Sequence, residues 1–202
     1  QSTFHQTPPT TMHDSTILLG AVAYDPKVAS IWDGIRDYFQ DSGVPMDFVL
    51  FSNYERQVQS LLDGFLDIAW NTPLAHVRVK NATDGKSLSL GMRDADQDFH
   101  ARVIVRKDAG ISSLQDLPGK KLAVGSADST QARILPLHFI AQEGVQINQA
   151  DLLVFDTDVG KHGDTGTSEL DVLKALHDGQ ADAGVVGDLI WLNELSAGHI
   201  DA

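Results

Sequence analysis

Leu61-Leu62-Asp63-Gly64-Phe65-Leu66-Asp67-Ile68-Ala69 returns later in the chain as Leu176-His177-Asp178-Gly179-Gln180-Ala181-Asp182-Ala183-Gly184. Each copy reads as the end of an amphipathic helix, a glycine that stops it, an aspartate and a short apolar strand. Such a unit brings a chain back to a parallel sheet, where the strand is buried on both faces. One copy occurs by chance in many α/β proteins. Two copies predict two similar lobes, with a ligand cleft between them.

The composition is that of a globular protein and excludes several kinds of partner. The chain has 202 residues, of which 42% are hydrophobic, enough for one large domain or two lobes. Its formal net charge is −13 and its Lys and Arg residues form no run, so we expect no nucleic-acid partner. No apolar run is long enough to span a bilayer, which predicts no membrane insertion by this chain. The lack of cysteine excludes disulfides and fits an oxidising compartment.

The first sixteen residues are predicted to be a polar tail. They include Pro8 and Pro9 and contain no apolar signal core. The chain also begins at Gln1, as a processed or trimmed protein would.

Residues 17–107 are predicted to form lobe one. Helical spacing of apolar residues over 28–40, and a polar cap followed by proline at Asn71-Thr72-Pro73, predict helices between the strands. Strands alternating with helices through short connections predict an open, mostly parallel sheet. The strands are expected within the apolar runs 17–23, 48–51 and 67–70, followed by two β-like runs at 88–92 and 101–105.

Residues 108–202 are predicted to form lobe two, entered through a polar crossing at 106–110. A strand at 122–125 is followed by a helix from about Ser129 to Gln142. A second strand, a loop and a helix over 169–177 lead into the second copy of the repeat. Both lobes are therefore expected to be sheets flanked by helices.

The strongest chemical signal lies where the strand of 122–125 meets its helix, in Gly125-Ser126-Ala127-Asp128-Ser129-Thr130-Gln131. Unpaired backbone N–H groups, short hydroxyl side chains and the positive end of a helix dipole together make a cradle for an anion. The alternative is an ordinary helix cap at Asp128 or Ser129. No phosphate-binding Gly-Lys-Ser/Thr loop and no Gly-x-Gly-x-x-Gly is present, so a small anion is favoured over a nucleotide.

These motifs together resemble the periplasmic solute-binding proteins of ABC importers with the type II fold, in particular the phosphate/phosphonate-binding family. The resemblance runs from Ile17 to Ala202. It rests on their order along the chain: Ser52-Asn53-Tyr54 after the second strand, Asp116-Leu117-Pro118-Gly119-Lys120-Lys121 before a strand, Ser129-Thr130 at a helix start, and the second repeat.

The resemblance implies a set of ligand-binding residues. Ser129 and Thr130 would bind phosphoryl oxygens, Tyr54 would close over them, His162 would add a donor and Asp188 would read a ligand amine. Ser126 and Gln131 complete the cradle, while Tyr24, Trp70, Asn71 and Thr72 lie at strand ends, where open α/β sheets bind ligands. No cofactor and no metal ion is implied.

Each of these residues also has a structural interpretation. Tyr54 is also compatible with a partly buried helix aromatic, Trp70 with a core residue and Asp188 with a helix cap. His162 suits either a binding loop or a solvated turn. Several features depart from the family pattern: Gln131 stands where a second serine is expected, and Asp128 adds a negative charge beside the cradle. The segment Gly160 to Ser168 is also longer and richer in glycine than the family's loop, and Trp70-Asn71-Thr72 is unusual there. A larger zwitterion therefore fits nearly as well as a phosphonate.

The predicted function is to capture a small oxyanion or zwitterion between the lobes and deliver it to a membrane permease, as a periplasmic or lipid-anchored monomer. A ligand-sensing domain of the same fold in a regulatory protein is the alternative. An enzyme is disfavoured, because His162, Asp164 and Asp188 could exchange protons but no nucleophile stands with a base. The fold would also return to lobe one after the second repeat. The sequence ends at Ala202, so we expect that segment to be absent.

Overall fold

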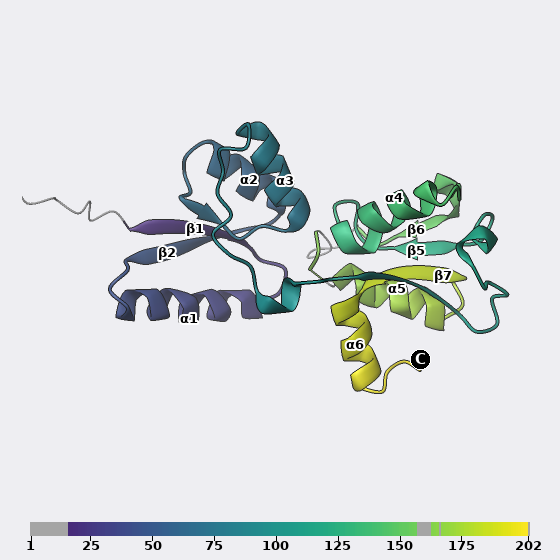
Figure 1. Ribbon diagram of the computed structural model, residues 1–202. Coiled ribbons are helices and arrows are strands. Elements are labelled where there is room, and N and C mark those ends of the chain that lie inside the picture. Colours follow the sequence, from purple (N-terminus) through teal and green to yellow (C-terminus); the bar gives the residue numbers. More distant parts are fainter. Residues whose placement is uncertain (1–15, 157–162, 166, 202) are drawn as a thin grey trace, which may run out of the picture.

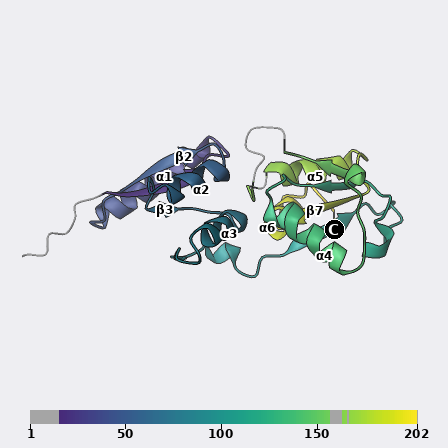
Figure 2. The same cartoon turned by 90° about the horizontal axis from the view of Figure 1, so that it is seen from above.

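Two α/β lobes lie side by side, and a single long segment joins them (Figure 1). The structure is a computed structural model, and it describes residues 16–156, 163–165 and 167–201. A view from above shows the two lobes next to each other along the long axis of the molecule (Figure 2). The predicted polar tail falls, except for Thr16, outside the described residues.

Lobe one contains a parallel three-stranded sheet in the order β2-β1-β3. Helix α1 covers one face of the sheet, and α2 and α3 cover the other (Figure 1). Asn53 begins α2 by accepting the Arg56 N–H at 2.9 Å, and Thr72 followed by proline begins α3 as predicted. The elements are β1 (Ile17–Val22), α1 (Lys27–Asp41), β2 (Met46–Phe51), α2 (Tyr54–Leu62), β3 (Ile68–Ala69) and α3 (Pro73–Ala82).

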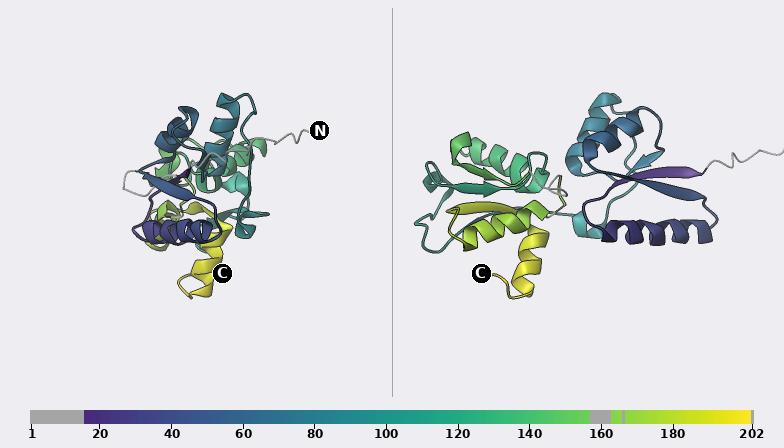
Figure 3. Two further views of the ribbon diagram at one scale, coloured as in Figure 1. Left: turned by 90° about the vertical axis from the view of Figure 1, so that its left-hand side faces the viewer. Right: turned by 180° about the vertical axis from the view of Figure 1, so that it is seen from behind.

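Lobe two contains a four-stranded sheet in the order β4-β7-β5-β6. Helices α4 and α5 cover its opposite faces, as the rear view also shows (Figure 3). The main elements are β4 (Ala101–Val105), β5 (Leu122–Val124), the π-helical turn η3 (Thr130–Ile134), α4 (Leu135–Gln142), β6 (Leu152–Val154), α5 (Thr167–His177), β7 (Ala183–Gly187) and α6 (Asp188–Ser196). Three short 3₁₀ turns complete the described elements: η1 (Asp94–Asp96), η2 (Leu114–Asp116) and η4 (Gln149–Asp151).

Two details of the predicted organisation were wrong. Strand β4, expected in lobe one, pairs antiparallel with β7, from Ala101 opposite Gly187 to Val105 opposite Ala183. The chain therefore crosses from lobe one to lobe two before β4. Strand β4 then forms the edge of the second sheet, antiparallel to β7. The β-like run 88–92 forms no strand, and its Leu88 and Leu90 side chains are exposed.

The cores follow from strand alternation. In β5, Leu122 and Val124 face one apolar cluster with Ile140 of α4, while Ala123 faces another with Val172 of α5. Burial on both faces explains why the strand is a continuous apolar run. Lobe one is built the same way, with separate clusters packed against the two faces of β1.

The repeated Gly-x-x-Asp performs the same task in both lobes. Gly64 and Gly179 end their helices with φ of +78° and +70°. The Asp67 carboxylate accepts the Leu18 N–H at 2.8 Å, while the Asp67 N–H donates to the Leu18 carbonyl at 2.9 Å. Asp182 makes the matching pair with the backbone of Lys121, at 2.9 and 2.8 Å. Each aspartate thus fastens the end of a helix to the start of the neighbouring parallel strand.

Asp182→Ala is expected to lower the free energy of unfolding by about 1–3 kcal/mol, because the Lys121 N–H loses a charged acceptor. Urea unfolding followed by circular dichroism measures the change. Asp178→Ala is the matched control, since Asp178 lies in the same turn and its carboxylate forms a solvent-exposed ion pair with Lys174. Equal destabilisation by the two variants would show that the backbone contact of Asp182 is not the cause.

Candidate functional site

The residues of the predicted anion cradle lie together between the end of β5 and the start of η3. The Ser129 side chain accepts the Ala132 N–H at 3.0 Å and so caps η3, which continues into α4. A Cβ on Gly125 would lie 2.8 Å from the Ala132 Cβ, so glycine is needed for the helix start to approach the strand. Ser126 and Ser129 are both buried. The structure thus bears out the helix cap at Ser129, while the use of these groups as an anion site stays a prediction.

Two donors of this cradle are directed at a carboxylate of the chain itself. Asp164 Oδ1 accepts the Ser129 hydroxyl at 2.9 Å and the Gln131 backbone N–H at 3.0 Å. Thr130 contributes a buried hydroxyl that has no hydrogen-bond partner within the described structure. The cradle thus binds a negatively charged oxygen with the groups expected to bind a ligand oxyanion.

The turn that carries Asp164 also contacts lobe one. Gly163 has φ of +56°, and a Cβ there would lie 2.5 Å from the Tyr54 ring and 3.1 Å from the Thr72 methyl group. Its N–H donates to Asp128 at 2.6 Å, and its carbonyl accepts the Ser126 hydroxyl at 3.3 Å. A glycine is required here by backbone conformation and by space, since two residues of lobe one pack directly on it.

Tyr54 faces the cradle from lobe one. It is the first residue of α2 and is buried. Burial raises the pKa of its hydroxyl well above the ordinary value, and the nearby carboxylates of Asp164 and Asp128 raise this pKa further. Tyr24 also contributes to this rise, whereas Arg93 lowers the pKa of Tyr54. The Tyr54 hydroxyl is therefore retained as a neutral donor beside the cradle.

The three residues after β3 have distinct places. Trp70 is 41% exposed and packs edge to face on Trp32, with ring centroids 6.0 Å apart. Gln57 is fully buried and donates its side-chain amide to the Trp70 carbonyl and to Asn71 Oδ1. Thr72 caps α3. Trp70 thus packs within lobe one and leaves part of its side chain exposed.

Gln131 reaches the cradle with its backbone and turns its side chain elsewhere. Its amide donates to Glu169 Oε1 at 2.6 Å, and Glu169 Oε2 accepts the Gly187 N–H at 2.6 Å. Glu169 is only 1% exposed. Burial is the main cause that raises the pKa of Glu169, with a smaller contribution from Asp164. The Gln131 side chain therefore joins η3 to α5 and β7.

Asp188 is held by β4. Its carboxylate pairs with Arg102 and with His100 Nδ1, which lies 3.2 Å away, and its N–H donates to the His100 carbonyl. It begins α6 but forms no side-chain cap. The ion pair with Arg102 joins residues far apart in the sequence and follows from the antiparallel pairing of β4 with β7.

A cavity of about 1850 Å³ extends between the lobes along the side chains of this site. Its lining includes Arg93, which was not among the predicted site residues. The Arg93 guanidinium donates two hydrogen bonds to the Asp96 carboxylate, at 2.7 and 2.8 Å. Asp188, Ser126 and Ser129 are not among the lining residues, although they support those that are. The predicted site residues that line it are Tyr24, Tyr54, Trp70, Asn71, Thr72, Thr130 and Gln131.

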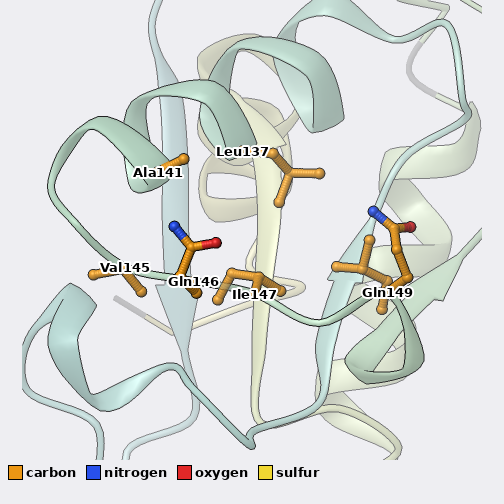
Figure 4. Close-up of a pocket in the computed structure, with 7 residues that line it drawn as sticks. Leu137, Ala141, Val145, Gln146, Ile147 and Gln149 are labelled. Carbon is orange, nitrogen blue, oxygen red and sulfur yellow. The ribbon is translucent and has the colours of Figure 1, made fainter.

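A second cavity, of about 190 Å³, lies apart from the cradle, beside α4 (Figure 4). Leu137, Val145 and Ile147 point toward it, together with two glutamine side chains. No charged side chain lines it. Its polar side chains are the two glutamines, and it has no hydroxyl or cationic side chain of the kind that lines the large cavity, so the cradle is the candidate site.

Some predicted features lie beyond these observations. His162 is outside the described residues. Among the residues that the structure describes, no three His, Cys, Asp or Glu side chains are grouped as a metal site requires. In the same part of the chain, no helix combines the length and the apolar character needed to cross a membrane.

The profile of the family described as "ABC transporter, phosphonate, periplasmic substrate-binding protein" matches residues 21–202. The chain belongs to this family. The phosphonate-binding family and its two-lobed type II fold, both expected from the order of the motifs, are thus confirmed. The family is a transport family and not an enzyme family.

Relatives within the phosphonate-binding family are moderately similar. A probable ABC transporter phosphite binding protein, PhnD1 of Prochlorococcus marinus, is 27% identical over 75% of this chain and 50% of its own length. The phosphate-import protein PhnD of Mycolicibacterium smegmatis is 25% identical over 89% of this chain and 60% of its own length. The chain therefore spans 50–60% of the length of these curated relatives.

The fold of this chain is also found in a solved structure. PhnD1 from Prochlorococcus marinus, in complex with methylphosphonate, superposes with a TM-score of 0.64 and 23% sequence identity. The match covers 89% of this chain and 66% of that one. At this identity the likeness concerns the fold.

Gly163→Ala is expected to lower the free energy of unfolding by about 2–5 kcal/mol, because a strained φ and a collision with Tyr54 add to each other. Gly43→Ala is the control, because Gly43 has φ of +78° and open space around its Cβ position. It should cost about 1–2 kcal/mol from the backbone alone. Urea unfolding of both variants makes the comparison, and a Gly163 variant no less stable than the Gly43 variant would contradict the contact between lobes.

Tyr54 is expected to make the protein less stable in alkali. The hydroxyl has a raised pKa in the folded protein and an ordinary value of 10.0 when exposed, so the folded state holds its proton more tightly. The resulting stability is complete below pH 10 and falls as the pH rises further.

Tyr54→Phe should therefore lose less stability between pH 9 and pH 11 than the wild type, a window of about one unit on each side of the exposed value. Chemical unfolding at each pH measures this loss. Tyr38→Phe removes a hydroxyl from a residue that is 70% exposed and is the control. Parallel pH curves for the wild type and Tyr54→Phe would contradict the burial effect.

Proposed function

We propose that this chain is the solute-binding component of an ABC importer. It captures a small oxyanion or zwitterion of the phosphonate or phosphate type between its lobes and presents it to a membrane permease. The observation that carries the proposal is the cradle at the start of η3: Thr130 and Gln131 line one cavity with Tyr54 of the other lobe, and the buried Ser129 hydroxyl shares its acceptor with the Gln131 N–H. The names of relatives, which include phosphite and phosphate binding proteins, support this ligand class.

Binding in such a cleft acts through the two lobes together. A ligand that contacts the cradle and Tyr54 at once stabilises the arrangement in which the lobes are close, and only this difference in affinity shifts the population. A permease can then distinguish the loaded protein by shape. The protein works outside the cytoplasm, in the periplasm or on a lipid anchor, as a monomer and without catalysis.

The ion pair of Asp188 with Arg102 bears on the choice between oxyanion and zwitterion. An acid that reads a ligand amine must have a free carboxylate, whereas this one already has a cation within hydrogen-bonding distance. A ligand amine would have to replace a guanidinium that is attached to the chain. We therefore favour a simple oxyanion over an aminated one.

Thr130→Val is expected to weaken binding of methylphosphonate about tenfold or more, the effect of removing one hydrogen bond to a charged ligand. Its hydroxyl has no partner in the described structure, so the variant should be at least as stable as the wild type. Isothermal titration calorimetry with methylphosphonate, phosphite, phosphate, methanesulfonate and aminomethylphosphonate measures affinity, and thermal unfolding measures stability.

Ser113→Ala serves as the control, since Ser113 caps the turn η2 and does not line the cavity. It should leave all affinities unchanged. Unaltered binding by Thr130→Val would remove Thr130 from the site. Absence of binding to every oxyanion, by the wild type and by all variants, would overturn the proposed function.

A further inference from the structure

Asp164 occupies the donors that the proposed ligand would use. Its Oδ1 lies 2.9 Å from Ser129 Oγ and 3.0 Å from the Gln131 nitrogen. We infer that Asp164 is a specificity-determining residue: its carboxylate is an internal competitor that the ligand must displace from the cradle. This inference rests on the proposed function, because it takes the cradle to be an oxyanion site.

The competition follows from counting protons. The Ser129 hydroxyl has one proton, which it donates to Asp164, while its oxygen is engaged as acceptor of the Ala132 N–H at 3.0 Å. The backbone of Gln131 likewise has one N–H. A ligand oxygen can therefore receive these two bonds only after the Asp164 carboxylate has moved away.

Asp164 is not an ideal occupant of its position. Its second oxygen, Oδ2, is buried and has no hydrogen-bond partner within the described structure. Two further carboxylates, Asp128 and Glu169, lie close to it on the same lobe, and Asp164 raises the pKa of Glu169. A buried acceptor without a donor and like charges nearby both disfavour this arrangement. Displacement returns the Asp164 carboxylate to water and removes that cost.

The shape of a carboxylate also limits what Asp164 can bind. It takes two of the donors and leaves the Thr130 hydroxyl without a partner. A tetrahedral oxyanion has three oxygens directed toward one side and can use that third donor as well. A free planar carboxylate would gain nothing over Asp164, which is attached to the chain and so present at a high effective concentration. The internal competitor therefore selects tetrahedral oxyanions over carboxylates.

Asp164→Ala and Asp164→Asn test this inference. Calorimetry at fixed pH and salt should show methylphosphonate and phosphite binding about tenfold tighter or more to both variants. In the wild type, the apparent affinity is reduced because only the fraction of molecules in which Asp164 has left the cradle can bind the ligand. Acetate should bind measurably to Asp164→Ala and not to the wild type. Tighter methylphosphonate binding without any acetate binding would overturn the selection by shape.

Two controls separate competition from charge. Asp128→Asn removes the same charge next to the cradle, but Asp128 accepts the Gly163 N–H and neither cradle donor. It should improve affinity less than the Asp164 variants do. Asp151→Asn changes a residue of η4 outside the cavity lining and should have no effect. Equal gains from Asp128→Asn and Asp164→Asn would reduce Asp164 to a general electrostatic influence.

Nuclear magnetic resonance of the wild-type chain tests the same displacement without relying on the folding of any variant. Adding methylphosphonate should shift the Gln131 amide and the Asp164 carboxyl carbon together, as one bond replaces the other. A carboxyl signal that stays fixed while the ligand binds would show that nothing is displaced.

The outcomes distinguish this inference from the function beneath it. If the wild type binds methylphosphonate and the Asp164 variants bind it equally or more weakly, Asp164 is not a competitor and the transport function stands. If only the Asp164 variants bind methylphosphonate, the result supports both the competition by Asp164 and the proposed function. If no variant binds any oxyanion of the panel, the function fails and the inference fails with it.

Discussion

An aspartate carboxylate that accepts a backbone N–H of the neighbouring strand organises both lobes. Asp67 and Asp182 each follow a helix that a left-handed glycine has ended, and each joins that end to the next parallel strand. Parallel neighbours cannot be linked by a tight hairpin, so their register depends on where the crossing helix delivers the chain. Once that position is fixed, the strand ends align at one edge, and the cradle and the residues facing it follow.

The site depends on a second constraint, the close contact of the two lobes at Gly163. A turn of lobe two packs on Tyr54 and Thr72 without room for a side chain, and it places the next residue, Asp164, in the cradle. The same turn therefore makes the contact with lobe one and the contact with the cradle. A carboxylate of the protein accepts the two donors that we propose for a ligand oxyanion, and the proposed selectivity of the site rests on this contact.

The sequence indicated which residues lie together at the start of η3, and it indicated less about what surrounds them. Ser129 and Thr130 were found because small polar residues at a strand-to-helix junction have a local physical meaning. Asp164 was considered only as an acid that could exchange protons, since nothing local shows which donors its side chain will meet. Arg93 gave no signal at all. Asp188 was expected to read a ligand, yet β4 crosses over to supply Arg102 and His100 as its partners.

The sequence by itself determined the two-lobed α/β fold and its family, since helix ends, caps and buried strands are encoded within a few residues of one another. It also determined that a cradle of hydroxyl and backbone donors stands after β5. Only the tertiary structure decided that β4 joins the second sheet, that Gly163 meets Tyr54 and that Asp164 occupies the cradle. These are contacts between residues far apart in the chain. They depend on how whole sheets and lobes pack, which no local pattern specifies.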